Sequence, residues 1–407
     1  MRKNIITGVS LVALSAGMAQ AGGFELQTLD TSLMYADGNQ ASVTHATIDA
    51  SIEGFNTALP SSTKKAVVKD QTVTNFAAKF DMGESLSFGL STYRSGSIQL
   101  DGGNGAAPGF NLAPTGDIDL DSSALLARYS LNENVSFLGG VTNNTLGAGV
   151  VTTMGGEYTV SGKTSMGYVA GIAYSIPDIA LRAELTYQPR TKISTTTAFV
   201  PTAGAVQSAM GIAALDAADP NADPNPLSGL PAATVTSLMT STASTTNLAL
   251  PEAIAFNFQT GIAEDTLLTA SYRRASWGSA QINIDAPVAI NTEFSDTESF
   301  SVGVARRFSE NWSASISYSK EEGSSSPATS LFTVSNGSEA VSLGMRYTSG
   351  NMTISGGISQ RNVGDVTVDP GFAADPRSPT PHPLAGMKMQ YSGNSVTSIG
   401  LKIAFAF

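Results

Sequence analysis

The chain has 407 residues, only 14% of them charged, and a formal net charge of −11. This excess of Asp and Glu argues against nucleic acid as a partner, because binding to phosphates needs a surplus of Lys and Arg. Soluble domains typically carry about a quarter charged residues, so the chain also lacks the charge of an ordinary soluble surface. The absence of Cys fits an oxidising compartment but is only a weak indication of one.

Residues 1–21 are predicted to be a secretory signal peptide. Arg2 and Lys3 form a basic start, a short apolar stretch follows over 5–18, and Ala19-Gln20-Ala21 is a cleavage site of the A-x-A kind. A membrane-anchoring helix is the alternative, but the apolar stretch is short for a span of about 20 residues. No other segment of the sequence could cross a membrane as a helix, so a membrane location would require a closed barrel.

Fourteen β-strands are predicted from the alternation of large apolar residues with small or polar ones. The pattern is clearest in a hairpin over 250–284, where Ile254, Phe256 and Phe258 recur at every second position of the first arm. The two arms of this hairpin are the eighth and ninth strands. The others are expected at 40–56, 68–82, 86–100, 117–131, 135–152, 163–176, 179–195, 296–309, 312–322, 338–349, 351–368 and 394–407.

The links between these strands alternate in length. Short turns close six hairpins, near residues 83, 132, 177, 264, 310 and 349, whereas the links at the opposite ends are longer and variable. Bacterial outer-membrane barrels have short periplasmic turns and longer external loops. The sequence therefore predicts an all-β fold, a 14-stranded antiparallel transmembrane β-barrel over 40–407 in the outer membrane of a Gram-negative bacterium. A short hatch-like N-terminal segment, 22–39, is expected in or at the mouth of the lumen.

The last strand alternates apolar with small residues and ends at Phe407. This ending resembles the signal that the barrel-assembly machinery reads, so that machinery is an expected partner. The large apolar face of each strand is expected to contact outer-membrane lipid, and the barrel is expected to be a monomer.

The link over 196–250 is predicted to be a long external loop. It is rich in Ala, Thr and Pro, with stretches at 205–218 and 232–239 that could form short amphipathic helices. A link of this length without strands is either functional or disordered. Two interpretations remain open at this point: a mobile surface loop, or a cap whose apolar face captures a ligand.

No arrangement of residues in the sequence predicts an enzyme. The two histidines, His45 and His382, are expected to face solvent, and a chance Ser near one of them carries little weight in so Ser-rich a chain. Asp117, Asp119 and Asp121 alternate but lack the Gly and closing Glu of a calcium loop, so we expect charges at the external rim. Neither a metal nor a cofactor is predicted.

Cations on the inward face of the strands are candidates for holding a ligand carboxylate. Four are expected in the lumen together with Glu184: Arg182, Arg307, Arg346 and Lys402. One of Arg273 and Arg274 should also point inward, but the alternation alone does not decide which. Most of these groups are expected to pair with neighbouring charges, and one or two could hold a carboxylate by charge-assisted hydrogen bonds.

The segment 250–277 resembles the FadL family of outer-membrane transporters for long-chain fatty acids and other hydrophobic compounds. The resemblance rests on Leu250-Pro251-Glu252 at the start of one strand and on Tyr272 followed by Ser276-Trp277 at the end of the next. Phe308 to Trp312 and the closing strand are also similar. The resemblance implies fourteen strands, an N-terminal hatch and a sideways exit through the wall, for which Gly89 and Gly96 are candidate weak points. Unlike family members, the chain has only residues 22–39 before the first predicted strand and no Asn-Pro-Ala motif, so either the hatch is reduced or the first predicted strand is part of it.

The predicted function is passive uptake of long-chain fatty acids or other hydrophobic compounds across the outer membrane. The predicted substrate-binding residues are Phe24, Arg182, Arg273, Arg307, Arg346 and Lys402. A general porin for small polar solutes and an importer of aromatic hydrocarbons are the alternatives within the membrane. A secreted β-rich adhesin is the alternative outside it.

Overall fold

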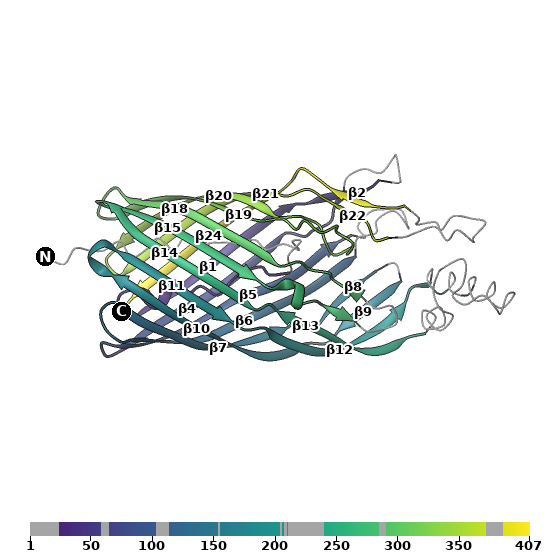
Figure 1. The fold of residues 1–407 in the computed structure, drawn as a ribbon, viewed down its shortest axis with the longest axis horizontal. Helices are drawn as coiled ribbons and strands as arrows, with labels where there is room; N and C mark the ends of the chain where they lie inside the picture. The colour runs from purple at the N-terminus through teal and green to yellow at the C-terminus, as the bar shows by residue number, and fades with distance from the viewer. Residues whose placement is uncertain are drawn as a thin grey trace.

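The computed structural model describes residues 24–57, 65–102, 114–153, 155–203, 206, 210, 240–284, 290–371 and 386–407. Its main feature is a closed antiparallel barrel of fourteen strands, which closes where the first strand pairs with the last (Figure 1). In order around the wall the strands are β1 (Gln40–Ser51), β4 (Gln71–Met82), β5 (Leu86–Asp101), β6 (Thr115–Ser130), β7 (Val135–Leu146), β10 (Lys163–Ile176), β11 (Leu181–Gln188), β14 (Ala253–Ala263), β15 (Thr266–Ala275), β18 (Thr297–Arg307), β19 (Trp312–Glu321), β20 (Ser338–Ser349), β21 (Met352–Val363) and β24 (Asn394–Ala406).

Six further strands of the described residues extend the wall beyond one end of the barrel. They are β8 (Gly149–Thr152), β9 (Gly156–Val160), β12 (Thr191–Pro201), β13 (Thr242–Leu250), β16 (Asn283–Ile284) and β17 (Ile290–Asn291). A separate small sheet contains β2 (Glu53–Asn56), β3 (Lys65–Ala66), β22 (Val366–Val368) and β23 (Met389–Tyr391). Three 3-10 turns complete the described elements: η1 (Ser32–Tyr35), η2 (Pro177–Ile179) and η3 (Trp277–Ser279). Within the described ranges, no helix is long and apolar enough to cross a membrane.

The predicted fourteen-stranded barrel is confirmed, and the six short turns gather at the end where the C-terminus lies (Figure 1). Four predicted strands are each split in two: 40–56 into β1 and β2, 135–152 into β7 and β8, 179–195 into β11 and β12, and 351–368 into β21 and β22. The predicted signal peptide, 1–21, lies outside the described residues and stays a prediction.

The prediction of a strandless link over 196–250 is wrong at both of its ends. Residues up to Pro201 continue β12, and residues from Thr242 form β13, which pairs with it in register from Thr191–Leu250 to Phe199–Thr242. The buried positions of this stretch mix Thr, a β-branched residue that favours strands, with the large apolar Ile193, Phe199 and Leu248. The expected helices over 205–218 and 232–239 lie almost wholly outside the described residues.

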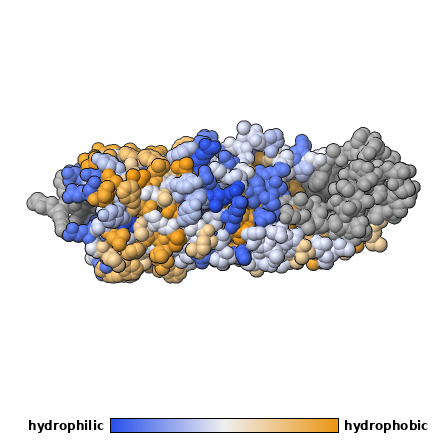
Figure 2. Space-filling view, turned by 60° about the horizontal axis from the view of Figure 1, so that its bottom comes forward, coloured by the Kyte–Doolittle hydropathy of each residue, from blue (hydrophilic) through white to orange (hydrophobic). Residues whose placement is uncertain are grey.

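Large apolar side chains cover the outside of the barrel at the end that carries the short turns, as the predicted lipid-facing strands require (Figure 2). Phe256, Leu343 and Ile399 are representative, at 41%, 51% and 55% exposed. Aromatic residues border this band, with Tyr129, Phe137, Phe308 and Trp312 toward the short turns and Tyr168, Tyr187, Tyr272 and Tyr318 toward the extension. Such girdles mark the two membrane–water interfaces of a transmembrane barrel.

Candidate functional site

The N-terminal segment, residues 24–39, is packed inside the barrel. Its start forms two backbone hydrogen bonds with β5, from Leu26 N to Ser95 O at 3.1 Å and from Ser97 N to Phe24 O at 2.9 Å. Farther along, the buried Lys79 of β4 donates its Nζ to the carbonyl oxygens of Ala36 and Gly38 at 2.7 and 3.0 Å. The segment is therefore held at both of its ends by the wall that surrounds it.

Strand β5 leaves its neighbour β4 part-way along the wall. The β4–β5 ladder of the described residues stops at the pair Ala77–Ser91, and the next contact is a hydrogen bond from Phe76 N to the Thr92 side chain at 3.0 Å. Beyond that point β5 pairs instead with residues 24–26 and then with residues 67–69. A register shift between Arg94 and Gly96 marks the bend.

Two glycines let the N-terminal segment pack on β5: Gly96 lies at the bend, whereas Gly89 lies within the β4–β5 ladder, paired with Lys79. A Cβ on Gly96 would lie 2.5 Å from the Phe24 ring, and a Cβ on Gly89 would lie 2.3 Å from the sulfur of Met34. Only Gly allows the N-terminal segment to pack this closely on β5. On the outer face, a groove of about 430 Å³ adjoins the point where the strands part, lined by apolar side chains that include Val43, Phe76 and Leu90.

An apolar pocket lies above the N-terminal segment, toward the extension. Phe24 forms one side and contacts Trp277 and Phe294 with ring centroids 5.2 and 6.2 Å apart. The other lining residues are Ile98, Ile118, Leu120, Leu146, Val151, Val160, Thr246, Leu248, Ile282, Ile284, Thr292 and Phe332. The enclosed volume is about 30 Å³, room for roughly one water, so a larger ligand would have to displace side chains.

The alternation in β15 is resolved in favour of Arg273 as the inward residue. Its guanidinium is bound by both carboxylate oxygens of Glu25, with Nη1–Oε2 and Nη2–Oε1 each 2.7 Å. Arg274 points outward and pairs with Asp296 at 3.5 Å. Since Arg273 is already in a two-point ion pair, it braces the N-terminal segment in this state.

A second polar contact joins the N-terminal segment to β11. The buried Glu184 accepts hydrogen bonds from Thr31 Oγ1 at 2.8 Å and from Tyr35 OH at 2.9 Å. The guanidinium of Arg182 stacks on the Tyr35 ring at 4.3 Å, and Arg128 stacks at 5.1 Å. Arg182 points into the lumen, as expected, and its guanidinium plane packs against the Tyr35 ring.

The remaining predicted cations lie nearer the short-turn end of the barrel. Arg307 forms an ion pair with Asp265 in the β14–β15 turn. Arg346 and Lys402 face inward on β20 and β24, and both are register partners of Ser355 on the strand between them. These two cations are therefore brought together on one inner row. Arg307 lies on the same inner row, because its register partner Ser313 is also the partner of Arg346, and its charge is paired with Asp265.

The polar groups considered for metal binding or catalysis have other contacts. Asp117, Asp119 and Asp121 face outward, where Lys69 pairs with the first at 3.4 Å and Arg94 with the other two at 2.9 and 3.0 Å. Among the described residues, no group of three or more His, Cys, Asp or Glu could hold a metal ion. The Nδ1 of His45 lies 3.0 Å from Thr74 Oγ1 on an exposed face, and His382 lies outside the described residues.

Neither the models of protein families nor the curated proteins gave a match to this sequence. Among solved structures, a Pseudomonas aeruginosa FadL homologue matches with a TM-score of 0.69 at 14% identity, over 96% of this chain and 98% of that chain. The chain has the fold of this FadL homologue. The Pseudomonas putida toluene transporter TodX and the Ralstonia pickettii toluene transporter TbuX also match, with TM-scores of 0.58 and 0.57 at 11% and 12% identity, each over 97% of both chains.

Several residues of this FadL-type fold were not identified as site residues from the sequence. Trp277 and Phe294 complete the apolar pocket with Phe24, and Glu25 and Tyr35 link the N-terminal segment to the wall. Trp277 belonged to the recognised motif, which was a signal that it could be functional. Glu25 and Tyr35 gave no such signal, because the residues that they contact, Arg273 and Glu184, are far away in the sequence.

Proposed function

We propose that the protein is a passive outer-membrane channel for the uptake of hydrophobic compounds, with long-chain fatty acids as the expected class. The observation that carries the proposal is the apolar pocket around Phe24, which has no charged side chain in its lining. Transferring an apolar ligand from water into such a pocket is favourable by about 25 cal/mol per Å² buried. The fold shared with a FadL homologue and with two toluene transporters also supports uptake of hydrophobic compounds.

A porin for polar solutes fits the interior less well. Porin lumens are polar and filled with water, whereas here Phe24, Leu26 and Val334 belong to a continuous buried apolar cluster. The N-terminal segment also occupies the lumen. Transport of a hydrophobic compound without covalent chemistry or an energy source is therefore the function that we propose.

The bend in β5 is the proposed exit. A ligand in the apolar pocket is separated from the outer groove by residues 24–26, which take the place of β4 as the partner of β5. A small shift of this segment would open the wall beside Phe76 and Thr92, where the ladder has already stopped. The ligand would then leave sideways toward the apolar groove and the lipid.

A fatty acid also needs a place for its carboxylate. Lys402 and Arg346 are the proposed groups, because they share an inner row on which the third cation, Arg307, is already paired with Asp265. Within the part of the chain that the structure describes, Lys402 has no carboxylate partner. Arg182, Arg273 and Arg307 are proposed to shape the path rather than to bind the ligand directly.

Uptake of aromatic hydrocarbons is a second candidate function. A pocket lined by apolar residues and two Thr suits a ligand without a charged head. The toluene transporters TodX and TbuX have the same fold. Both candidates use one pocket and differ in whether the Arg346–Lys402 row contributes.

Fluorescence of Trp277 tests the proposed pocket, because bromine atoms quench a nearby indole. The chain has two Trp, so a Trp312→Phe variant leaves Trp277 as the reporter. Brominated stearate, or bromobenzene for the second candidate, should quench this variant saturably and leave the matched Trp277→Phe variant with only unsaturable quenching. If neither compound quenches Trp277 saturably, the proposed pocket is wrong.

A further inference from the structure

The barrel wall has a second interruption, far from the bend in β5. Strand β11 ends at Gln188 and β12 begins at Thr191, while the neighbouring β13 ends at Leu250 and β14 begins at Ala253. Pro189 and Pro251 stand in these two gaps, and a proline cannot donate a hydrogen bond to a ladder. The transmembrane wall and its extension are therefore joined at this level by irregular backbone.

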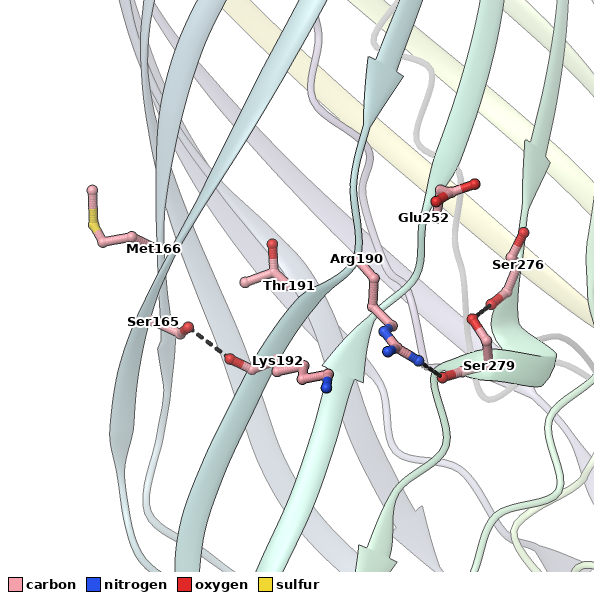
Figure 3. A pocket seen from close by; sticks show the side chains of 8 residues that line it. All are labelled: Ser165, Met166, Arg190, Thr191, Lys192, Glu252, Ser276 and Ser279. Carbon is pink, nitrogen blue, oxygen red and sulfur yellow. Dashed lines mark hydrogen bonds between the residues drawn. The ribbon is translucent and has the colours of Figure 1, made fainter.

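Strand β10 does not close the interruption. Its ladder with β11 covers Ala170–Ile176, and among the described residues the contact above it is a hydrogen bond from Ser165 Oγ to Lys192 O at 2.7 Å. A pocket of about 650 Å³ opens outward here (Figure 3). Pockets of about 300–1,000 Å³ are of the size that holds small organic ligands.

The lining of this wall pocket is polar and carries two cations. It consists of Ser165, Met166, Arg190, Thr191, Lys192, Glu252, Ser276 and Ser279. Arg190 uses one nitrogen for Ser279 O at 2.7 Å, and Lys192 has no ion-pair partner among the described residues (Figure 3). The carboxylate of Glu252 accepts a hydrogen bond from Tyr187 at 3.0 Å. With two cations and this one anion, the lining has a net charge of +1.

The wall pocket also lies at the level of lipid headgroups. Tyr187 and Tyr168 are exposed on the lipid-facing side just below it, as residues of the aromatic girdle near the extension. Such girdles lie at the membrane–water interface. Met166, 63% exposed, continues the apolar surface up to the pocket.

We propose that the wall pocket binds the phosphorylated sugar headgroup of a glycolipid in the outer leaflet, with Arg190 and Lys192 holding the phosphate. Arg and Lys bind phosphate oxygens through charge-assisted hydrogen bonds, and basic pockets at the membrane surface recognise anionic headgroups. Ser165, Thr191, Ser276 and Ser279 line the rest of the pocket, and the hydroxyls of Ser165 and Ser279 already donate to backbone carbonyls, so Ser276 is the hydroxyl proposed to meet the sugar. The acyl chains lie along Met166 and Tyr168.

The test measures binding of diphosphoryl lipid A to the purified full chain by native mass spectrometry. We expect one lipid to be retained, and the Arg190→Gln/Lys192→Gln variant to bind it about tenfold more weakly, because two charge-assisted contacts are lost. Lys192→Gln alone should weaken binding by a smaller factor, and no described contact of the fold depends on its Nζ. Lys163→Gln, an exposed cation on β10 outside the pocket, is the matched control and should bind normally.

Two further probes distinguish the sources of the phosphate. Lipid A from which the phosphates have been removed should bind the wild type as weakly as the double variant does. Inorganic phosphate should not displace the lipid, since it lacks the acyl contacts. Equal retention of diphosphoryl lipid A by the wild type and the double variant would overturn the proposal, and so would displacement by equimolar inorganic phosphate. None of these probes is a transported compound, so either result leaves the proposed uptake function untouched.

Discussion

Arg273 on β15 holds Glu25 of the N-terminal segment in a two-point ion pair, with both N–O distances 2.7 Å. The side chains are 17% and 20% exposed, so water screens the pair only partly. Directly beside this contact, the backbone on either side of Glu25 is bonded to β5. The start of the N-terminal segment is thus held from two sides of the barrel, in the position that covers the proposed exit.

We therefore expect Arg273→Met to loosen the N-terminal segment. Removing one partner of a largely buried ion pair costs about 3 kcal/mol. Here the variant should destabilise the position of the segment inside the barrel by that amount. Ion conductance in planar bilayers should rise several-fold over that of the wild type. Arg274→Met is the matched control, because this neighbour points outward to Asp296, and it should leave conductance unchanged. Equal conductance of the Arg273→Met variant and the wild type would count against the brace.

The proposed sideways exit can be closed by a disulfide. The chain contains no Cys, so Phe76→Cys/Thr92→Cys introduces one pair at the point where β4 and β5 part. Oxidation should lower ligand uptake by on the order of tenfold, and reduction should restore it. Ligand binding, measured by quenching of Trp277 in the Trp312→Phe background, should be retained. Phe80→Cys/Phe88→Cys bridges two residues that are already ladder partners and should have no effect on uptake. Normal uptake by the oxidised first pair would exclude this exit.

Lys79 is expected to be the main anchor for the far end of the N-terminal segment. Its side chain is 1% exposed and bonds two backbone carbonyl oxygens and Asp81. Lys79→Met keeps the volume but leaves these acceptors without a donor, at a cost of about 3 kcal/mol. The temperature at which the folded band is lost in heat-modifiability gels should fall clearly. Lys163→Met, at an exposed site, should not change it, and an unchanged transition for Lys79→Met would refute the anchor.

The Phe24 ring is expected to contribute directly to ligand affinity. It contacts Trp277 and Phe294 and is only 3% exposed, so Phe24→Ala removes one side of the apolar pocket. The apparent affinity for brominated stearate should fall by about tenfold, equivalent to ~1.4 kcal/mol. Phe24→Leu should recover most of that loss, which separates lost apolar contact from a general loss of fold. Unchanged affinity of the Ala variant would remove Phe24 from the binding site.

The outer surface of the barrel could be predicted because lipid imposes a strict period of two on each strand. The lumen could not be, since its contacts join residues far apart in the chain, such as Glu25 with Arg273 or Tyr35 with Glu184. The extension strands were missed where Thr replaced large apolar residues, as in β13. Pro189 and Pro251 are both visible in the sequence. That they interrupt neighbouring strands at the same level of the wall is seen only in the structure.

Uptake of labelled oleate and labelled toluene by cells with and without the protein tests the central claim most directly. Cells that produce the protein should accumulate at least one of the two compounds several-fold faster, without any dependence on added energy, and the oxidised Phe76→Cys/Thr92→Cys variant should lose that advantage. A specific loss of oleate uptake in a Lys402→Met variant would assign the carboxylate site. Equal accumulation of both compounds in cells with and without the protein would contradict the proposed function.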